Sequence, residues 1–336
     1  MSTIAGQLEA WYATHARDLP WRRGTSSWGR LVSEFMLQQT QVSRVIDRWT
    51  AFMVRFPTPI AAAQATEQEM LAAWQGLGYY RRARMLHGAA RTIVDRFEGE
   101  VPSTIADLQT LPGVGRYTAG AVASIAFGER TPIVDANVHR VLCRLHCHGG
   151  EASPSAWTWE QADVLVEDAT DPAMLNEALM ELGATICTPR RAECESCPIA
   201  SDCRGKNDIE SIPPPRKTTD RRRIHHHAVV MHQDGLIAFE QRPNEGLWGS
   251  MWQVPTVEAD HSLETEVVAR SIDSVTDLHE VASFEHVLTH RVVVFHVYQG
   301  RCTNDARFIW GKGGDSEDFP LANAQRKVLA CVSVSQ

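Results

Sequence analysis

Residues 103–126 read STIADLQTLPGVGRYTAGAVASIA, and this stretch predicts two helices joined by a tight turn. Ser103 or Thr104 can cap the first helix, because a side-chain hydroxyl accepts a hydrogen bond from a free N–H of the first turn. We expect that helix to end near Thr110. The second helix is rich in alanine, glycine and serine, whose small side chains let neighbouring backbones approach closely.

The turn itself is LPGVG, residues 111–115. Pro112 presets φ, and Gly113 and Gly115 permit the positive φ values that a sharp reversal needs. A turn without side chains leaves the N–H groups of the second helix open to an anion, which on DNA is a phosphate. An ordinary helical hairpin is the alternative, because glycine-rich turns are common.

Length, composition and charge narrow the class of protein. At 336 residues the chain is long enough for two domains, each with its own core. It contains no run of about 18 apolar residues and begins without a secretion signal, so we expect a cytoplasmic protein. The net charge is −8, and Lys and Arg number 22 against 26 Asp and Glu up to residue 220, and 11 against 15 after it. Any DNA contact must therefore use a local patch or backbone groups.

The first hundred residues have the spacing of helices. Pro20 is expected to end an amphipathic helix that opens the chain. Trp21 and Arg22, which follow, can stack on a base or pin a loop, and we favour the loop. Apolar residues then recur at helical spacing over residues 28–49.

Glu34, Gln38 and Gln41 share the other face of that second helical stretch. A carboxyl group close to apolar side chains can be a partly desolvated acid with a raised pKa. The alternative for Glu34 is a solvated helix face, because most glutamates of helices contact water.

The sequence GLGYY, residues 76–80, interrupts further helices. Glycines on both sides of Leu77 predict a turn that leaves bulky side chains exposed, and such side chains can be pushed between bases. Arg81, Arg82 and Arg84 follow directly and can hold phosphates. A helix start with basic surface residues is the alternative.

Asp135 stands where the N-cap of a helix belongs, after Pro132 and before an apolar helical stripe. Capping alone would explain an aspartate at this position. The catalytic alternative needs a partner, and we propose Glu34, because paired carboxyl groups around a glycosidic bond are a recurrent hydrolytic arrangement. Residues 157–186 are predicted to be helical, and Glu177, Met180 and Glu181 share one face there.

Four of the eight cysteines fall within 17 residues, as Cys187-x6-Cys194-x2-Cys197-x5-Cys203. In a cytoplasmic chain this clustering predicts a metal site and not disulfides. Four thiolates on short loops can hold one tetranuclear iron–sulfur cluster. Zinc is the rival, but the x6 and x5 spacings are unlike the paired CxxC motifs of a zinc ribbon.

The composition changes after the cysteines. A proline triplet at 213–215 and polar residues behind it predict a linker over residues 211–225. The histidines at 225–227 can bind a metal, but neighbours in a strand point to opposite faces, so we interpret them as the start of a strand. Asp234-Gly235 predicts a hairpin.

A helix near residues 262–274 and a strand at 292–298 complete the pattern of a small α+β domain over 226–336. His286, Thr289 and His290 precede that strand, where they can contact a ligand or merely cap the sheet.

Four stretches resemble the MutY-type adenine DNA glycosylases of the helix–hairpin–helix superfamily: SEFMLQQTQV (33–42), GLGYY (76–80), GRYTAG (115–120) and NEALMELG (176–183). The resemblance implies a mostly α, two-lobed glycosylase domain with an iron–sulfur loop, over residues 1–210. The remaining third resembles the α+β MutT-like (Nudix-like) domain of these enzymes. It lacks the acidic helix of nucleotide pyrophosphatases, so that activity is not expected.

The same resemblance implies a monofunctional base-excision-repair glycosylase. Its substrate would be double-stranded DNA with adenine opposite 8-oxoguanine or guanine, and its product an abasic site. The adenine must be flipped out, because its glycosidic bond is unreachable inside a stacked duplex. We expect a monomer, associated with the nucleoid and with no membrane partner.

The family's catalytic centre maps onto four residues of this chain. Glu34 matches the acid that protonates adenine N7, which requires a carboxyl group that is neutral near pH 7. Asp135 matches the carboxylate that stabilises the oxocarbenium-like sugar, and Tyr117 and Asn137 match residues that support the centre. Tyr117 also stands where the related endonuclease-three enzymes carry a lysine that cleaves the strand, so strand cleavage is not expected.

The resemblance further assigns three binding groups. The adenine pocket comprises Arg17, Leu19, Trp21, Arg22, Leu37, Glu177 and Met180. The DNA contacts, with Tyr79 as a wedge, comprise Gln38, Gln39, Thr40, Leu77, Tyr79, Arg81, Gly113, Gly115 and His139. The residues that recognise 8-oxoguanine comprise His286, Leu288, Thr289 and His290.

The sequence departs from the family's pattern in two stretches. Ala136 replaces the glycine of the usual Asp-Gly-Asn, and its small size makes harm to the site unexpected. Leu288 and Thr289 replace the Phe-Ser that precedes His290. Thr289 keeps the hydroxyl, whereas the lost phenyl ring leaves the strength of the 8-oxoguanine preference open.

Three other functions were weighed against the sequence. A lyase-active glycosylase of the endonuclease-three type is disfavoured by Tyr117. A non-catalytic damage-binding protein is disfavoured by the presence of both Glu34 and Asp135. A zinc-stabilised scaffold would be colourless, whereas an iron–sulfur protein is brown.

Overall fold

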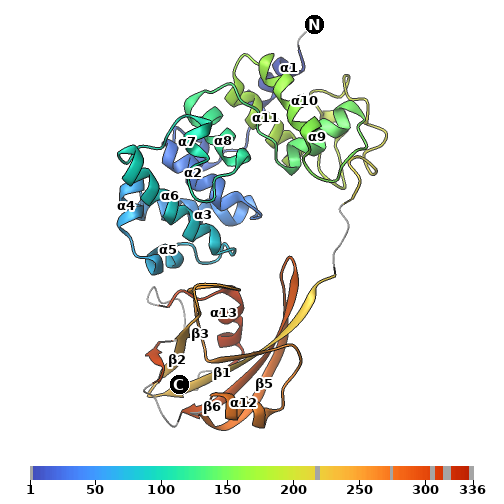
Figure 1. Ribbon diagram of the computed structural model, residues 1–336. Helices are drawn as coiled ribbons and strands as arrows, with labels where there is room; N and C mark the ends of the chain where they lie inside the picture. The colour runs from blue at the N-terminus through green and yellow to red at the C-terminus, as the bar shows by residue number, and fades with distance from the viewer. Residues whose placement is uncertain (1–2, 216–219, 273–274, 303–306, 313–318, 333–336) are drawn as a thin grey trace. The chain divides into compact units, whose positions relative to one another are not determined.

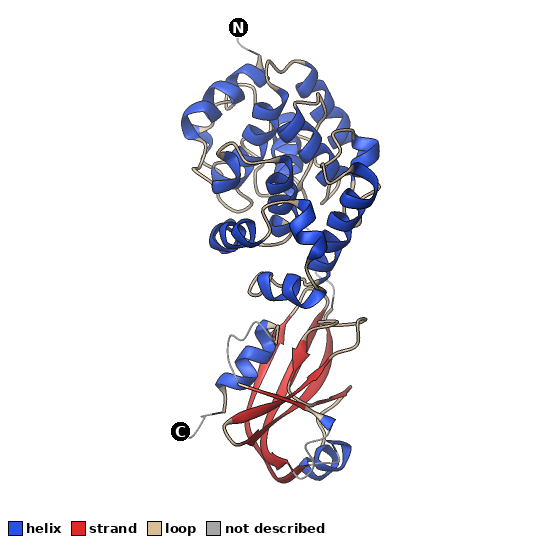
Figure 2. Cartoon of the chain, turned by 90° about the vertical axis from the view of Figure 1, so that its left-hand side faces the viewer, coloured by secondary structure: helices blue, strands red, loops and turns tan. Residues whose placement is uncertain are grey.

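The computed structural model describes residues 3–215, 220–272, 275–302, 307–312 and 319–332. The chain forms two compact units, one from residues 1–64 and 85–217 and the other from residues 65–84 and 218–336. The first consists of helices, and the second contains the sheet (Figure 2). None of the helices that the structure describes is both long and apolar enough to cross a membrane.

The division differs in one respect from the sequence-based assignment. Residues 65–84, expected in the first domain, belong to the second unit. There Gln68 accepts a hydrogen bond from Trp252 Nε1 at 3.1 Å and donates one to the backbone oxygen of Ser250. Residues 216–219 of the expected linker lie outside the described residues, and the boundary at 211–225 stays a prediction.

Short connections join the helices that lie wholly or mainly in the first unit. These are α1 (Ile4–His15), α2 (Ser27–Leu37), α3 (Val42–Arg55), α4 (Pro59–Gln64), α6 (Arg81–Phe97), α7 (Ile105–Leu108), α8 (Arg116–Phe127), α9 (Ala136–His146), α10 (Ala156–Glu167) and α11 (Pro172–Thr185). Two 3-10 turns, η1 (Pro20–Arg22) and η2 (Cys194–Ser196), complete the unit.

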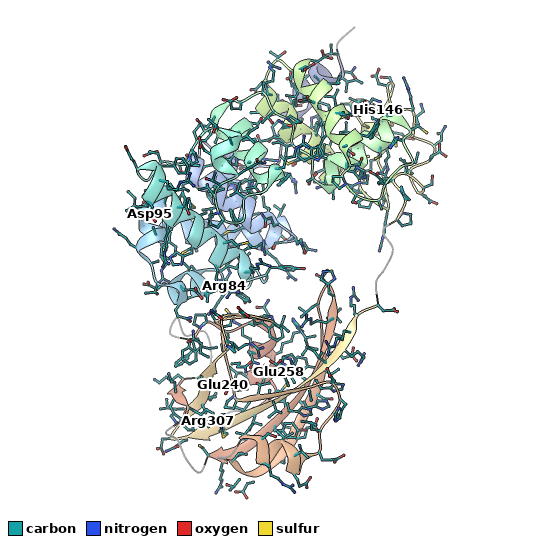
Figure 3. All side chains as sticks on the ribbon, viewed as in Figure 1. Arg84, Asp95, His146, Glu240, Glu258 and Arg307 are labelled. Atoms are coloured by element: carbon teal, nitrogen blue, oxygen red, sulfur yellow. The ribbon has the colours of Figure 1, made fainter. Side chains whose placement is uncertain are left out.

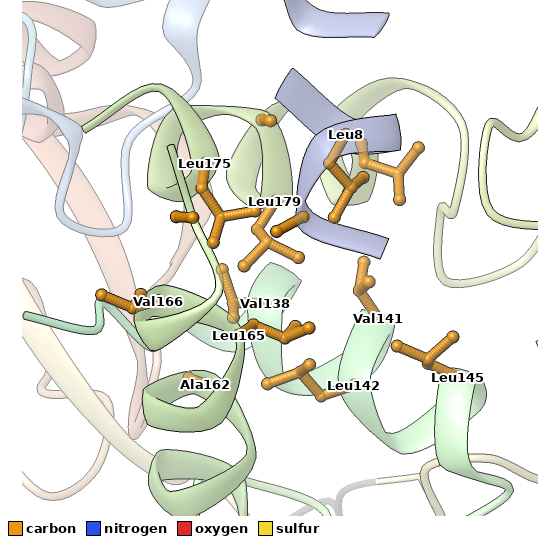
Figure 4. Packing of buried hydrophobic residues seen from close by; sticks show 14 of the residues in the cluster. Leu8, Val138, Val141, Leu142, Leu145, Ala162, Leu165, Val166, Leu175 and Leu179 are labelled. Atoms are coloured by element: carbon orange, nitrogen blue, oxygen red, sulfur yellow. The ribbon is translucent and has the colours of Figure 1, made fainter. Parts of the chain in front are cut away.

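The N-terminal helix packs with the last helices of the unit. Figure 1 shows α1 beside α10 and α11, and Figure 4 shows Leu8 of α1 among Leu142, Leu165 and Leu179 of α9, α10 and α11. All of these side chains are almost fully buried. Because α2 contacts α3 and α8 instead, the helices form two lobes, as the sequence predicts.

The stretch expected as one helix over residues 28–49 is two helices. Gln39 adopts a left-handed φ of 55°, and the next helix, α3, starts at Val42 with Gln41 as its N-cap. The common face expected for Glu34, Gln38 and Gln41 is therefore wrong, because a break in the helix separates Gln41 from the other two.

The central hairpin forms as predicted, with one correction. Thr104 caps α7 by accepting a hydrogen bond from Asp107 N, and α7 ends slightly early, at Leu108. Gly113 has φ 79°, and a Cβ there would lie 2.8 Å from Met85 Cβ, so a side chain is excluded. Gly115 does not have a positive φ; at −92° it is extended, and it is the N-cap of α8.

The second unit is built on a seven-stranded sheet. Its strands are β1 (Arg222–Gln233), β2 (Leu236–Gln241), β3 (Trp252–Gln253), β4 (Thr256–Ala259), β5 (Val275–Val287), β6 (Arg291–Cys302) and β7 (Ile309–Gly311). Its helices are α5 (Glu67–Ala73), α12 (Thr265–Ile272) and α13 (Asn323–Ala330). The strand order is β3-β2-β1-β6-β5, with β4 paired to β1 and β7 paired to β2.

Strand β1 is buried on both faces. Val230 packs in one cluster with Val328 of α13, and Val229 packs in another with Val268 of α12. Successive side chains of a strand point to opposite faces, so a continuous apolar run here serves two layers. Strand β1 pairs in parallel with β6, and both are central strands of the sheet.

The predicted hairpin at Asp234-Gly235 is confirmed, since it joins β1 to β2 with positive φ at both residues. Strand β5 was not expected from the sequence, because its residues are mostly exposed and lack the apolar alternation of a half-buried strand. His225 and His227 stack on His296. His226 instead faces Phe295 on the other side of the sheet, as alternation requires.

Candidate active site

Glu34 lies in α2 with 3% of its surface exposed. Burial raises the pKa of its carboxyl group, and the charges of Glu177 and Asp135 raise it further. The Arg30 guanidinium and a hydrogen bond with Tyr117 oppose that rise. The solvated helix face considered for Glu34 is therefore wrong, and the carboxyl group has the environment of a proton donor.

Asp135 is the N-cap of α9, as the sequence predicts. One carboxylate oxygen accepts a hydrogen bond from Val138 N at 2.7 Å, and the other accepts one from Asn137 Nδ2 at 2.9 Å. Burial raises the pKa of Asp135, and these hydrogen bonds oppose the rise because they stabilise the ionised form. Asn137 is held in turn by Arg140, whose Nη2 donates to Asn137 Oδ1 at 3.0 Å.

Tyr117 lies in the first turn of α8, close to both carboxyl groups. Burial raises the pKa of its hydroxyl well above the usual value, and the charges of Glu34 and Asp135 raise it further. The hydroxyl also lies 3.5 Å from Met180 Sδ of α11. A phenol in this position stays protonated and can donate a hydrogen bond to a carboxylate.

The carboxylates of α11 are bound by arginines from the N-terminal segment. Glu181, 1% exposed, accepts two hydrogen bonds from the Arg17 guanidinium at 2.6 and 2.8 Å and one from Arg22 Nη2 at 3.0 Å. Burial raises the pKa of Glu181, but these hydrogen bonds and charges outweigh burial and lower it. Glu177 accepts hydrogen bonds from Arg30 Nη2 at 2.8 Å and from the Tyr12 hydroxyl at 3.1 Å.

A cavity of about 280 Å³ opens beside Glu177, and Trp21, Arg22 and Arg30 are among the residues that line it. Trp21 is 2% exposed and packs edge-on against Trp49, so the loop-pinning role favoured for it agrees with the structure. Leu19 is also buried, whereas Leu37, at the end of α2, is partly exposed.

The turn at residues 76–80 exposes one aromatic ring. Tyr79 is 48% exposed and has φ 49°, a strained value for a bulky residue. Leu77 is 4% exposed, so the expectation of an exposed Leu77 is wrong. Arg82 is buried as well, with Nη2 donating to the backbone oxygens of Leu77 and Gly78, so it fixes the turn from inside. Arg81 remains exposed.

Three predicted DNA contacts lie between α2 and α3. Gln39 is exposed, and its positive φ, like that of Tyr79, marks a strained residue at a predicted contact. Gln38 Nε2 donates to Thr118 Oγ1 at 3.4 Å, and the Thr40 hydroxyl donates to the Gln38 backbone oxygen.

At the hairpin turn, Gly113 and Gly115 are exposed. A Cβ built on Gly115 would meet nothing within 4 Å, which leaves the first N–H groups of α8 open. This geometry suits a phosphate at the start of the helix.

The structure contradicts the prediction that His139 contacts DNA. It is 2% exposed, and its ring nitrogens contact Thr158 Oγ1 at 2.8 Å and the Glu151 backbone oxygen at 2.9 Å. A ring bonded on both sides inside the protein cannot reach DNA. His139 is buried because it lies on α9 among the apolar residues that pack into the protein interior.

The residues predicted to recognise 8-oxoguanine lie at the hairpin between β5 and β6. His286 precedes β6, as expected, but it lies within β5, and it packs edge-on against Trp248. Leu288 packs against the core, whereas Thr289 and His290 are exposed at the tip. Within the same unit, the Thr289 and Tyr79 hydroxyls are 2.8 Å apart.

The four clustered cysteines line one cavity. Sequence reasoning missed the residue that organises them, Arg144 of α9, which is 3% exposed. Its Nη1 donates to Cys187 Sγ at 3.4 Å, and its other nitrogens donate to backbone oxygens of the loop, including those of Pro189 and Ile209. Only the fold brings this arginine to the loop, so no local motif could have revealed it.

Sequence reasoning also missed Arg30. The signal was present, because an arginine four residues before Glu34 on a helix faces the same side.

The chain was compared with known proteins. The family described as "HhH-GPD superfamily base excision DNA repair protein" matches residues 32–160, and "NUDIX domain" matches residues 226–331. Adenine DNA glycosylase of Homo sapiens is 35% identical, over 89% of this chain and 67% of its own length. Adenine DNA glycosylase of Mycolicibacterium smegmatis is 46% identical, over 62% of this chain and 71% of its own.

Among solved structures, a thermostable thymine-DNA glycosylase is similar, with a TM-score of 0.55 and 29% identity. The similarity covers 60% of this chain and 94% of the other. These comparisons confirm the predicted combination of a helix–hairpin–helix fold with a Nudix-like domain.

Proposed function

This chain belongs to the adenine DNA glycosylases of the helix–hairpin–helix superfamily, and from that premise we propose its reaction. It hydrolyses the N-glycosidic bond of an adenine mispaired with 8-oxoguanine or guanine in double-stranded DNA and leaves an abasic site. The observation that carries this proposal is the buried Glu34 carboxyl group, with its raised pKa, beside Tyr117 and Asp135.

Glu34 acts as the general acid. A protonated carboxyl group delivers its proton to N7 of the flipped adenine and turns the base into a better leaving group. The electrons of the breaking C1′–N9 bond then move onto the protonated base. Burial supports this role, because it raises the pKa of the carboxyl group and so favours its protonated form.

Asp135 faces the sugar that loses the base. Two hydrogen bonds at the start of α9 favour its ionised form and fix its position. A carboxylate there stabilises positive charge as it develops at C1′, and water completes the hydrolysis. Glu34 and Asp135 thus resemble other carboxyl pairs in which different surroundings produce an acid and an anion.

Tyr117 limits the reaction to base removal. Strand cleavage by a glycosylase requires an amine that forms a Schiff base with C1′. A phenol with a raised pKa cannot supply one. The product is therefore an intact strand with an abasic site.

The duplex is held by the hairpin and by the turn at residues 76–80. Open N–H groups after Gly115 bind a phosphate, and Tyr79 enters the base stack as a wedge. Its partner in the second unit is Thr289, whose hydroxyl lies 2.8 Å from that of Tyr79. This contact supports a role for Thr289 in recognising the oxidised base opposite adenine.

The cysteine cavity fits an iron–sulfur cluster. Cys187, Cys194, Cys197 and Cys203 line it. Four thiolates on short loops can hold a tetranuclear iron–sulfur cluster, and their x6 and x5 spacings differ from the paired CxxC motifs of a zinc ribbon. The four cysteines would therefore hold a [4Fe–4S] cluster, which would tie the loop to α9 beside Arg144.

The test is single-turnover adenine release from duplexes with adenine opposite 8-oxoguanine, guanine, cytosine or thymine. We expect release from the first two, and strand breaks only after hot alkali. Breaks without alkali would indicate a lyase in spite of Tyr117. Tight binding of the mispair without any release would indicate a damage-binding protein instead.

A further inference from the structure

Arg30 lies one helical turn before Glu34 in α2, and only 6% of its surface is exposed. Its Nη2 donates a hydrogen bond to Glu177 Oε1 at 2.8 Å, and its Nη1 lies 4.0 Å from Glu34 Oε1. A buried guanidinium is costly unless carboxylates compensate it. One cation thus contacts both the proposed acid and a carboxylate of the proposed adenine pocket.

Charged and titratable groups face Glu34 from four elements. Arg30 comes from α2, Tyr117 from α8, Glu177 from α11 and Asp135 from the N-cap of α9. The two carboxylates favour the protonated form of Glu34, as burial does. Arg30 is the cation of this set and favours the ionised form.

Glu177 is held from three sides. The Tyr12 hydroxyl donates to it at 3.1 Å, and Arg22 Nε lies 3.6 Å from it. Arg22 also binds Glu181, so its charge is shared between two carboxylates. At 2.8 Å, Arg30 therefore provides the closest positive charge to Glu177.

We propose that Arg30 is a positioning residue for base release: it fixes Glu177 and sets the pH range over which Glu34 carries its proton. The proposal rests on the proposed function of Glu34 as the acid. A general acid works best when its pKa lies near the working pH. Burial and the two neighbouring carboxylates favour the protonated form of Glu34, and the guanidinium opposes them.

The first experiment measures the titration of Glu34 in the full chain without DNA. Glutamate carboxyl carbons are labelled with carbon-13, and the Glu34 signal is the one that is missing from Glu34→Gln. Arg30→Gln should raise the midpoint by about one pH unit or more, because an opposite charge at this range shifts a pKa by about 1–3 units. Arg30→Lys keeps the charge and should leave the midpoint near its original value.

Arg91→Gln is the matched control. It removes the same charge from an exposed position on α6 and should leave the Glu34 midpoint unchanged. An unchanged midpoint in folded Arg30→Gln, or an equal shift in Arg30→Lys and Arg30→Gln, would overturn the proposal. If Arg30→Gln does not fold, Arg30→Met replaces it; it also removes the positive charge and should raise the midpoint, and no shift would again overturn the proposal.

The second experiment measures single-turnover adenine release against pH. Release should decline at high pH as Glu34 loses its proton, and Arg30→Gln should move this decline upward by about one unit. A merely structural arginine would lower the rate equally at every pH. If the unaltered chain releases no adenine, the proposed function fails, whereas the carbon-13 titration still decides the role of Arg30.

Discussion

The helical unit and the sheet unit differ in which carboxyl groups and histidines they bury. In the helical unit, Arg30 and Glu181 are almost completely buried, and each is paired with an opposite charge. In the sheet unit the buried titratable groups include His226 and His227, and burial lowers the pKa of each to about 4. These histidines are therefore neutral at pH 7.

The carboxylates differ in the same way. Glu34 and Glu181 are inside the helical unit, whereas Glu258 of β4, labelled in Figure 3, is 47% exposed. Burying ions is costly, and a protein retains them where chemistry needs a fixed charge or a shifted pKa. The comparison supports the proposal that the helical unit carries the chemistry and the sheet unit contributes recognition.

The largest effect is expected when the proposed acid is removed. Glu34→Gln should lower single-turnover adenine release by about 10³-fold, within the range of general acids, and leave binding of the mispair intact. Glu160→Gln, an exposed position on α10, is the control and should release adenine normally. Normal release by Glu34→Gln would assign the acid role to another group.

The second test removes the proposed cluster. Cys194→Ser and Cys197→Ser should lose bound iron and brown colour, because each removes a thiolate ligand. Cys147→Ser changes an exposed cysteine of the same unit and should retain both. Iron content and visible absorbance measure the result, and a colourless protein that contains zinc would contradict the assignment.

The third test addresses the sheet unit through pH. The folded pKa of His226 lies below the unfolded value of 6.5, so its contribution to stability is complete above pH 6.5 and is lost as pH falls toward 4. The unit should lose up to about 3 kcal/mol over that range.

His226→Phe should flatten this pH dependence, measured by hydrogen exchange of β1 and β6. The exposed His279→Phe should not change it. Equal pH dependence in His226→Phe and the unaltered chain would show that this ring is not buried as a neutral group.

The smallest effect is expected at the tip of the β5–β6 hairpin. Thr289→Ala should reduce the preference for 8-oxoguanine over guanine by about 2- to 10-fold, which is the worth of one hydrogen bond. Thr289→Ser should retain the preference, and Thr276→Ala, exposed on β5, is the control. An unchanged ratio in Thr289→Ala would assign the discrimination to the helical unit.

The predictions that the structure confirms rest mainly on local sequence patterns. Capping by Thr104 and Asp135, the positive φ of Gly113 and the hairpin at Asp234-Gly235 each follow from a few neighbouring residues. Their physical causes act over one turn of chain, so they are readable without a fold.

Other expectations failed because burial is set by distant segments. Local sequence predicted exposed side chains at Leu77, Arg82 and His139. Packing in the folded protein buries all three. Strand β5 lacks the apolar alternation of a half-buried strand, and its pairing with β6 is what forms it.

By itself, the sequence determined the helical hairpin, the cysteine loop, the Nudix-like second domain and the two carboxyl groups of the proposed reaction. Only the tertiary structure decided the state of those groups. It buried Glu34, placed Tyr117, Glu177 and Asp135 of other elements close to it, and brought Arg144 to the cysteines. A pKa depends on solvent exclusion and on charges from other helices, and neither is a property of local sequence.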